Sequence, residues 1–375
     1  MKIKKEDFYY IYILIMTIIF YFRFYNFNNI IINNIYLLAT IFALISFFLY
    51  WIQKIYTLRE RIIHICIILF VCIIYYLSGH EYEYLIFSTL AIIGIKDKSL
   101  KKIMKIFVLS YGICLGIHFI LLGVGVFKDI VYTKISSGRK IDIHSLDFTT
   151  GNSFFAILFI FYSAIIYSYY DKIKPGILLL MEFLAILLYN VFYSRTGIVC
   201  ISILIIGTSI NKYVKINKYI RKIISSVEII IIPLMFLITL LFSTIFFATD
   251  MQKILDKVIS SRLIISHIYI EKYPISLFQM NFEYIGDLPL DNLYSFIMCA
   301  FGMIPTMIIN VCYIRLMVML LKNKKYFEMF YILIFAIYSY SEKMFINVFR
   351  NPSILMLGII LYDNFNFLNI GEKNE

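Results

Sequence analysis

IIIIPLMFLITLLFSTIFFA, residues 229–248, is the stretch that decides the fold class of this chain. It contains no charged side chain and matches the ~20 apolar residues that a helix needs to cross the hydrocarbon core of a bilayer. Similar apolar runs occur at 35–52, 62–77, 106–127 and 154–170. Hydrophobic residues make up 62% of the chain and charged residues 15%, whereas soluble domains contain about 45–50% and ~25%. We therefore expect an all-α integral membrane protein.

The apolar runs predict about twelve transmembrane helices. We place them at 8–22, 35–52, 62–77, 84–95, 106–127, 151–170, 175–193, 197–210, 229–248, 293–314, 326–341 and 353–368. Two of these runs, 84–95 and 197–210, are short enough to be re-entrant segments instead. Leaving out only one of them would place a Lys-rich stretch, 212–222 or 322–325, on the outside, so both cross or neither does. We expect both to cross.

The chain has no Pro-, Gly- or Ser-rich linker and no internal repeat, so we expect one multi-pass domain over residues 1–375. The two longest non-apolar stretches, about 128–150 and 249–292, fall on the predicted outer side and are expected to form two larger extracellular loops. All six Cys lie within apolar segments without CxxC spacing. This pattern predicts neither a disulfide framework nor a thiolate metal site.

The distribution of the charges predicts how the chain is oriented. Cytoplasmic loops of membrane proteins are enriched in Lys and Arg. With a cytoplasmic N-terminus, most of the 35 basic residues fall on inside segments, whereas the outside segments are close to neutral. We therefore expect a protein of the cytoplasmic (cell) membrane with both termini in the cytoplasm. The net charge of +12 then reflects membrane topology, and a nucleic-acid partner is not expected.

Arginine is enriched on the predicted outer side, whereas lysine predominates on the inner side. The outer arginines are Arg23, Arg139, Arg195, Arg262 and Arg350. A guanidinium group is planar and permanently charged, and it binds phosphate through two hydrogen bonds. The outer set therefore indicates a phosphorylated ligand. The alternative is that individual arginines, above all Arg23, bind lipid headgroups or loop carbonyls.

Arg195 stands in the tetrapeptide SRTG (194–197), which joins two apolar runs with almost no loop. A cation near the membrane costs free energy unless it has an anionic partner. Gly197 allows a tight turn, and Ser194 or Thr196 can cap the following helix. We interpret Arg195 as a candidate for ligand binding, and the alternative is an interfacial anchor.

Other polar residues near the outer boundary are candidates for acid–base chemistry or substrate binding. They are Arg139, His144, Asp147 and Asn152 before the sixth span, Arg262 and His267 in the second long loop, Asp291, Asn292 and Tyr294 at the start of a span, and Glu342 and Arg350 beside the last span. His and carboxylate side chains can take the proton of a hydroxyl substrate. Each has an ordinary alternative: loop polarity for His144, helix capping for Asp291 and a structural ion pair for Glu342.

Within the predicted spans, Glu182 and His118 are the ionisable residues that are hardest to explain, because charged groups are costly in a bilayer. A neutral carboxyl hydrogen-bonded between helices is the alternative for Glu182. The chain has no P-loop, HExxH or DxD motif, so neither a metal nor another cofactor is expected, and a nucleotide-sugar donor is not expected either. Glu81 and Glu83, which follow His80, form only a weak candidate site for a divalent ion.

Four short motifs on the predicted outer face, taken together with the topology, resemble the Wzy-type polysaccharide polymerases and the related O-antigen ligases. The motifs are SLDFTTGN (145–152), SRTG (194–197), SRL followed by a proline (261–274) and LDNLY followed by a glycine (290–302). The chain departs from the family pattern at Asp147, which follows Leu146, at Gly151, where proline is frequent, and at 278–279, which lacks the usual glycine.

The resemblance implies a glycosyltransferase of GT-C-like architecture that joins undecaprenyl-diphosphate-linked oligosaccharide repeat units on the outer face of the membrane, as in capsule, exopolysaccharide or O-antigen synthesis. It implies diphosphate binding by Arg139, Arg195, Arg262 and Arg350, proton transfer by His144, His267, Asp291 or Glu342, and substrate contacts by Asn152, Asn292 and Tyr294. Expected partners are the lipid-linked oligosaccharide, membrane lipid and other polysaccharide-assembly proteins. The alternatives are a flippase that transports the same lipid-linked oligosaccharide and a ligase-like glycan transferase.

Overall fold

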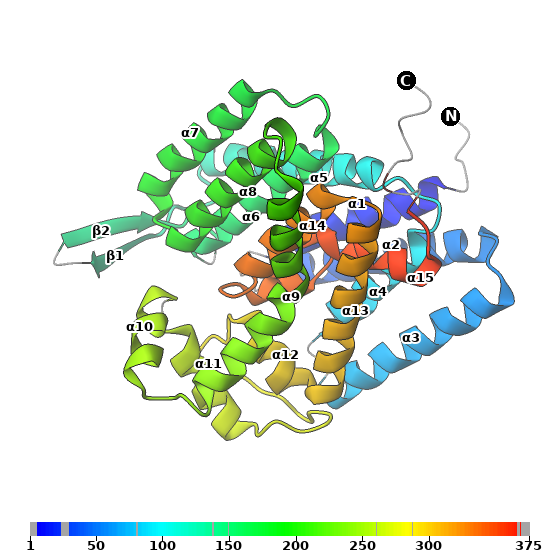
Figure 1. The fold of residues 1–375 in the computed structure, drawn as a ribbon. Helices are drawn as coiled ribbons and strands as arrows, with labels where there is room; N and C mark the ends of the chain where they lie inside the picture. Colours follow the sequence, from blue (N-terminus) through cyan, green and yellow to red (C-terminus); the bar gives the residue numbers. More distant parts are fainter. Residues whose placement is uncertain are drawn as a thin grey trace. The chain divides into compact units, whose positions relative to one another are not determined.

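The computed structural model describes residues 6–23, 30–79, 82–136, 139–148, 150–259, 261–286, 288–365 and 368. This part of the chain is α-helical, with two short 3-10 helices and one β-hairpin (Figure 1). By its internal contacts the chain divides into two units, which are described separately. Unit 1 comprises the described residues of 1–55, 94–213 and 365–375, and unit 2 those of 56–93 and 214–364.

Eight helices in the described residues are long and apolar enough to cross a membrane, which identifies a multi-pass membrane protein. They are Asn33–Gln53, Leu58–Leu77, Leu100–Gly123, Gly151–Ser168, Pro175–Phe192, Arg195–Tyr213, Lys218–Ser243 and Met303–Lys322. The predicted count of about twelve is therefore not confirmed.

The other four predicted spans hold apolar helices of only 10–17 residues. They are Asp7–Phe22, Glu83–Gly94, Tyr326–Tyr338 and Pro352–Tyr362. At ~1.5 Å per residue such helices reach at most ~26 Å, less than the ~30 Å hydrocarbon core. The predicted runs 326–341 and 353–368 extend past the ends of their helices, whereas 8–22 and 84–95 agree with theirs to within one residue at each end.

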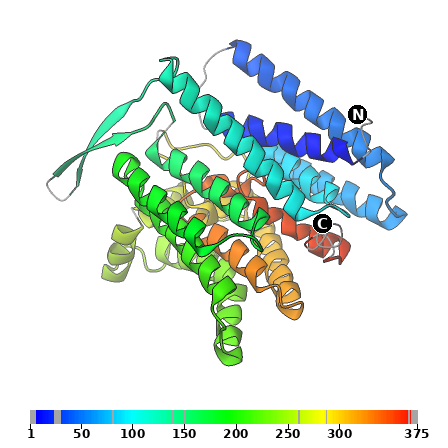
Figure 2. The ribbon, with the colours of Figure 1, turned by 90° about the horizontal axis from the view of Figure 1, so that it is seen from above.

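Unit 1 is built from six helices and a hairpin. The helices are α1 (Asp7–Phe22), α2 (Ile30–Gln53), α5 (Leu100–Gly123), α6 (Gly151–Ser168), α7 (Pro175–Phe192) and α8 (Arg195–Tyr213). α1 packs between α2 and α5 (Figure 2) and buries Tyr9, Tyr12 and Met16 completely. α6 contacts α5, α7 and α8, and 83% of its apolar window is buried. Among the eight candidate spans of the described residues, α6 is therefore by far the most enclosed by protein.

In the turn between α7 and α8, Ser194 caps α8 as the sequence predicts, but the left-handed residue is Tyr193, and Gly197 lies within the first turn of α8. Tyr193 ends α7 in the left-handed region with a φ of 47°, and the Oγ atom of Ser194 accepts the N–H of Gly197 at 3.3 Å. A Cβ atom on Gly197 would lie 2.5 Å from the Cβ atom of Phe155, so glycine is required for α8 to approach α6. α8 has 19 residues, long enough to cross, whereas the helix at Glu83–Gly94 has only 12, so the expectation that 84–95 and 197–210 both cross is not confirmed.

The first predicted outer loop, 128–150, contains a β-hairpin that the sequence reading did not anticipate. Strand β1 (Val131–Ser136) pairs antiparallel with β2 (Arg139–His144), and Val131 lies opposite His144. Across the strands, the Oγ1 atom of Thr133 donates a hydrogen bond to Asp142 at 2.8 Å. The second predicted loop, 249–292, begins with two helices, α10 (Asp250–Val258) and α11 (Arg262–Lys272).

Unit 2 contains the remaining elements. They are α3 (Leu58–Leu77), α4 (Glu83–Gly94), α9 (Lys218–Ser243), α10, α11, α12 (Leu293–Phe301), α13 (Met303–Lys322), α14 (Tyr326–Tyr338), the 3-10 helices η1 (Lys343–Ile346) and η2 (Pro352–Leu357), and α15 (Gly358–Tyr362). α9 contacts α11, α12, α13 and α14. The last predicted span, 353–368, thus contains, in its described part, a 3-10 helix followed by a short α-helix.

The span predicted at 293–314 is broken at Gly302, which separates α12 from α13. Gly302 has a φ of 90°, and a Cβ atom there would lie 2.8 Å from the backbone atoms Leu277 O and Gln279 N. The first N–H groups of α13 are paired with this loop, since Met303 N donates to Ser276 O at 2.8 Å and Ile304 N donates to Leu277 O at 3.0 Å. The break therefore fixes the 276–279 segment of the second predicted outer loop.

We expect Gly302→Ala to lower the free energy of unfolding by about 2–3 kcal/mol, because a side chain is strained at this φ and collides with backbone atoms that cannot move separately. Thermal unfolding of the purified protein in detergent measures the loss. Gly116→Ala is the matched control, since a Cβ at Gly116 meets nothing within 4 Å. Equal stability of the two variants would contradict the strain argument.

Candidate functional site

Four of the residues selected from the sequence lie in unit 2 and form one charged cluster. Arg262 begins α11, Asp291 precedes α12, and Glu342 and Arg350 flank η1. The Nη1 atom of Arg262 lies 2.8 Å from Oδ2 of Asp291, with side chains that are only 13% and 25% exposed. Its Nη2 atom donates to the carbonyl of Ser341 at 3.3 Å. Arg262 thus connects Asp291, which precedes α12, to Ser341, the residue before Glu342.

Glu342 is the buried member of the cluster, with 7% of its surface exposed. Burial, together with the negative charge of Asp291, raises the pKa of Glu342 to about 8, although the positive charges of Arg262, Lys343 and Arg350 act in the opposite direction. At neutral pH this carboxyl group is therefore mainly protonated. A group with a pKa near the working pH is well suited to proton transfer.

Lys343 is a further cation beside this carboxyl group. Its Nζ atom donates to the hydroxyl of Tyr284 at 2.7 Å and lies 4.0 Å from the centre of the Tyr284 ring. The sequence analysis selected neither Lys343 nor Tyr284 as a site residue. A charged pair in an otherwise apolar region was the available signal for Lys343, whereas nothing in the sequence distinguishes Tyr284 among 32 tyrosines.

Asn292 and Tyr294 adjoin the cluster in sequence, but their polar atoms make intramolecular hydrogen bonds. The Oδ1 atom of Asn292 accepts the N–H groups of Tyr294 at 2.9 Å and Ser295 at 3.4 Å, which caps α12. The hydroxyl of Tyr294 donates to Ala336 O at 2.7 Å, and both side chains are buried. The structure therefore places them as supports of the loop that carries Asp291, and their predicted contact with substrate is untested.

His267 joins α11 to the end of α9. Its ring stacks on Phe247 with centroids 3.4 Å apart, its Nδ1 atom lies 2.8 Å from Ser243 O, and its Nε2 atom lies 3.3 Å from Glu271. A second carboxylate supports the same helix, since Asp256 Oδ1 accepts the N–H of Leu263 at 2.7 Å. These contacts give His267 a packing function and leave its predicted role in proton transfer untested.

In unit 1, His144 pairs with a carboxylate that the sequence reading missed. The Nδ1 atom of His144 hydrogen-bonds to Asp129, whose other oxygen accepts the N–H of Leu146 at 3.0 Å. Burial acts to raise the pKa of Asp129, but these hydrogen bonds outweigh it and the pKa is lowered. The hydrogen bond to Asp129 therefore orients His144 at the base of the hairpin. In the same loop, burial raises the pKa of Asp147.

The other candidates of unit 1 are dispersed. Arg195 is exposed at the start of α8, where its Nη2 atom donates to the hydroxyl of Tyr193 at 3.2 Å. Asn152 is exposed in the first turn of α6. Arg139 lies opposite Ser136 in the hairpin, but its side chain is outside the described residues, as are His80 and Glu81. Because Arg195 belongs to unit 1 and Arg262 and Arg350 belong to unit 2, their shared outer face remains a prediction.

The two ionisable residues inside helices have packing partners. The hydroxyl of Ser202 in α8 donates to Glu182 in α7 at 2.5 Å, which agrees with a carboxyl hydrogen-bonded between helices. His118 stacks on Phe148 with centroids 4.4 Å apart, which holds the loop before α6 against α5. The structural alternative that the sequence left open for Glu182 therefore has direct support, and His118 has a packing function that the sequence did not predict.

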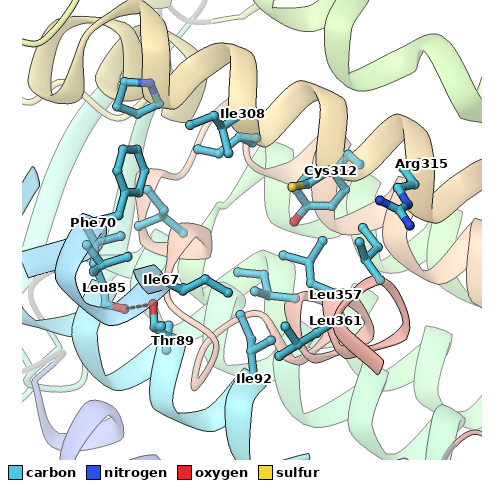
Figure 3. Close-up of a pocket in the computed structure, with 18 of the residues that line it drawn as sticks. Ile67, Phe70, Leu85, Thr89, Ile92, Ile308, Cys312, Arg315, Leu357 and Leu361 are labelled. Atoms are coloured by element: carbon cyan, nitrogen blue, oxygen red, sulfur yellow. Dashed lines mark hydrogen bonds between the residues drawn. The ribbon is translucent and has the colours of Figure 1, made fainter. Parts of the chain in front are cut away.

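A cavity of about 1050 Å³ lies within unit 2 (Figure 3). Its wall is formed by α3, α4, α9, α12, α13, α14 and the segment from η1 to α15, and most of the lining side chains are apolar. Asn351, which follows Arg350, and Ser339, which precedes Glu342 by three positions, belong to the wall. The chain that carries the charged cluster therefore also borders the cavity.

No family model, no curated protein and no solved structure matched the chain when it was compared with each. The arrangement of the residues is therefore the basis for a functional proposal.

Proposed function

We propose that this protein is a membrane glycosyltransferase that polymerises undecaprenyl-diphosphate-linked oligosaccharide repeat units on the outer face of the cytoplasmic membrane. The observation that carries the proposal is the buried carboxyl group of Glu342 among Arg262, Lys343 and Arg350 in a multi-pass membrane protein. The resemblance of the outer motifs to Wzy-type polymerases supports the same class.

The cluster offers what this reaction needs. A hydroxyl oxygen of the acceptor sugar attacks the anomeric carbon of the donor, and the bond from that carbon to the lipid diphosphate breaks. The diphosphate leaves with the electron pair, and guanidinium and ammonium groups stabilise its charge. The hydroxyl proton passes to the ionised form of Glu342. Arg262 would exchange part of its contact with Asp291 for the diphosphate.

We also propose roles for four residues of unit 1. Arg195 and Arg139 are candidates to hold the diphosphate of the other lipid-linked substrate, Asn152 is a candidate sugar contact, and His144, oriented by Asp129, is the alternative base. The lipid-linked oligosaccharide is the proposed substrate, and other polysaccharide-assembly proteins are proposed partners.

Polymerisation is tested by reconstituting the purified protein in lipid vesicles with undecaprenyl-diphosphate repeat units. We expect a ladder of products that grow by one repeat unit. Arg195→Ala and Arg350→Ala should each weaken the ladder strongly, because each removes a proposed diphosphate contact. Arg61→Ala is the matched control, since Arg61 lies on the predicted cytoplasmic side. No ladder from the wild type, or unchanged ladders from both variants, would reject the proposal.

The same vesicles separate the alternatives. A flippase would move the labelled lipid-linked oligosaccharide between leaflets without making a glycosidic bond. A ligase would transfer the oligosaccharide to an added lipid acceptor in one step and yield a single product. Either result in place of the ladder would assign the protein to that class.

A further inference from the structure

We propose that the cavity of unit 2 binds an anionic phospholipid, with the phosphate at Arg59 and Arg315 and the acyl chains along the apolar wall. Arg59 and Arg315 both line the cavity. This site is separate from the Glu342 cluster, and the proposal does not depend on the protein being a polymerase.

The two ends of the cavity differ in character. Figure 3 shows Arg315 at one end and Phe70 and Leu85 at the other. Lining residues of α3 run from Thr57 to Ile74, a rise of ~26 Å at ~1.5 Å per residue, so the cavity extends through most of the ~30 Å hydrocarbon core. A long apolar space with charge at one end matches the shape of a lipid.

α3 is attached to the rest of unit 2 near both of its ends. Near the first end, Tyr362 OH lies 3.0 Å from Nε2 of His64. At the second end, Leu77 O accepts the N–H of Asn281 at 2.9 Å. Between these attachments Ile67 and Phe70 line the cavity (Figure 3). An unfilled apolar cavity costs stability in proportion to its volume, and hydrocarbon chains are the abundant apolar filler in a bilayer.

The charges at the first end favour an anionic headgroup. Arg315 and Lys322 line a smaller adjoining pocket together with Asp363. The other acidic residue at this end is Glu60, whose Oε2 atom accepts the N–H of Thr57 at 2.7 Å in a capping box. Among the described residues, neither Arg59 nor Arg315 has an ion pair, so both guanidinium groups are available to phosphate.

Basic pockets between membrane helices attract anionic lipid headgroups. Guanidinium groups bind phosphate through paired, charge-assisted hydrogen bonds. Together, the charge at the end of the cavity and its apolar length select a phospholipid with a net negative headgroup over a zwitterionic one.

The first test measures lipid retention. The delipidated full-length protein in detergent is titrated with phosphatidylglycerol or with phosphatidylcholine of the same acyl chains, and bound lipid is counted by native mass spectrometry. We expect wild type to prefer phosphatidylglycerol by ~10-fold and Arg59→Gln/Arg315→Gln to lose the preference. Arg61→Gln, a charge lost from the same helix outside the cavity, should keep it. Equal binding of both lipids by wild type, or an unchanged preference in the double variant, would overturn the proposal.

The second test locates the acyl chains. Cys312 lines the cavity and Cys72 does not, and both side chains are of intermediate exposure. In variants that retain only one of these cysteines, phosphatidylglycerol should slow the reaction of Cys312 with an apolar maleimide and leave Cys72 unaffected. Equal effects at the two cysteines, or protection of Cys312 by undecaprenyl diphosphate but not by phosphatidylglycerol, would contradict a phospholipid site.

Discussion

Glu342→Gln is expected to lower the rate of repeat-unit polymerisation by roughly 10²–10⁴-fold, the usual effect of removing a general base. The amide cannot accept the proton of the acceptor hydroxyl. It does preserve the size and the neutral charge of the carboxyl group at pH 7, because the pKa of Glu342 is raised to about 8. The fold should therefore survive, and initial rates of ladder formation with the reconstituted protein measure the effect directly.

The pH profile distinguishes a base from a structural carboxyl. Ionised Glu342 is the reactive form, so kcat/KM of the wild type should rise with pH up to about 8 and then level off. The residual activity of Glu342→Gln should lack this rise. A variant with wild-type activity, or with the same pH-dependent rise, would remove Glu342 from the proton-transfer step.

The contribution of Glu342 to the stability of the fold should decrease as the pH rises, whereas the activity should increase. The pKa of Glu342 is raised above the value of 4.5 for an unperturbed glutamate, so the folded protein binds more protons than the unfolded chain between these values. Stability from this group is complete below pH 4.5 and is lost as pH rises through 8. The Tm of the wild type relative to Glu342→Gln should therefore fall from pH 5 to pH 8, and a constant difference would contradict the raised pKa.

The helical membrane class was predictable from the sequence because apolar runs are long and local. Membrane-crossing length was less predictable. The run 326–341 was predicted as one span, but its helix ends at Tyr338, and the run 84–95 forms a helix of only 12 residues. Hydropathy does not report where a helix stops, since Tyr, Ser and Thr occur both inside helices and in the loops beside them. The break at Gly302 depends on the approach of residues 276–279, which no local pattern encodes.

Individual site residues were predictable, but their pairing was not. Charged residues next to apolar runs are costly near a bilayer and are therefore candidates for function. This reasoning selected Arg262, Asp291, Glu342 and Arg350. The ion pair between Arg262 and Asp291 joins the start of α11 to the residue two positions before α12, and the path of the chain between them cannot be derived from composition. Asp129 was missed for the same reason, because its contact with His144 depends on the register of an unanticipated hairpin.

Arg262→Ala is expected to lower the free energy of unfolding by about 2 kcal/mol, since it leaves the Asp291 carboxylate partly buried without its cation. The same substitution should reduce the polymerisation rate by roughly 10²-fold through loss of charge stabilisation on the departing diphosphate. Both effects are measurable on one preparation, by thermal unfolding in detergent and by ladder formation in vesicles.

The exchanged pair, Arg262→Asp with Asp291→Arg, separates these two effects. It retains one cation and one carboxylate in contact, so a double-mutant cycle should show recovered stability relative to Arg262→Asp alone. Activity should stay low, because the guanidinium group no longer projects from the start of α11, where it also contacts Ser341 O. If the exchange restores activity together with stability, Arg262 acts only as a structural partner of Asp291, and the diphosphate must be held by Lys343 and Arg350.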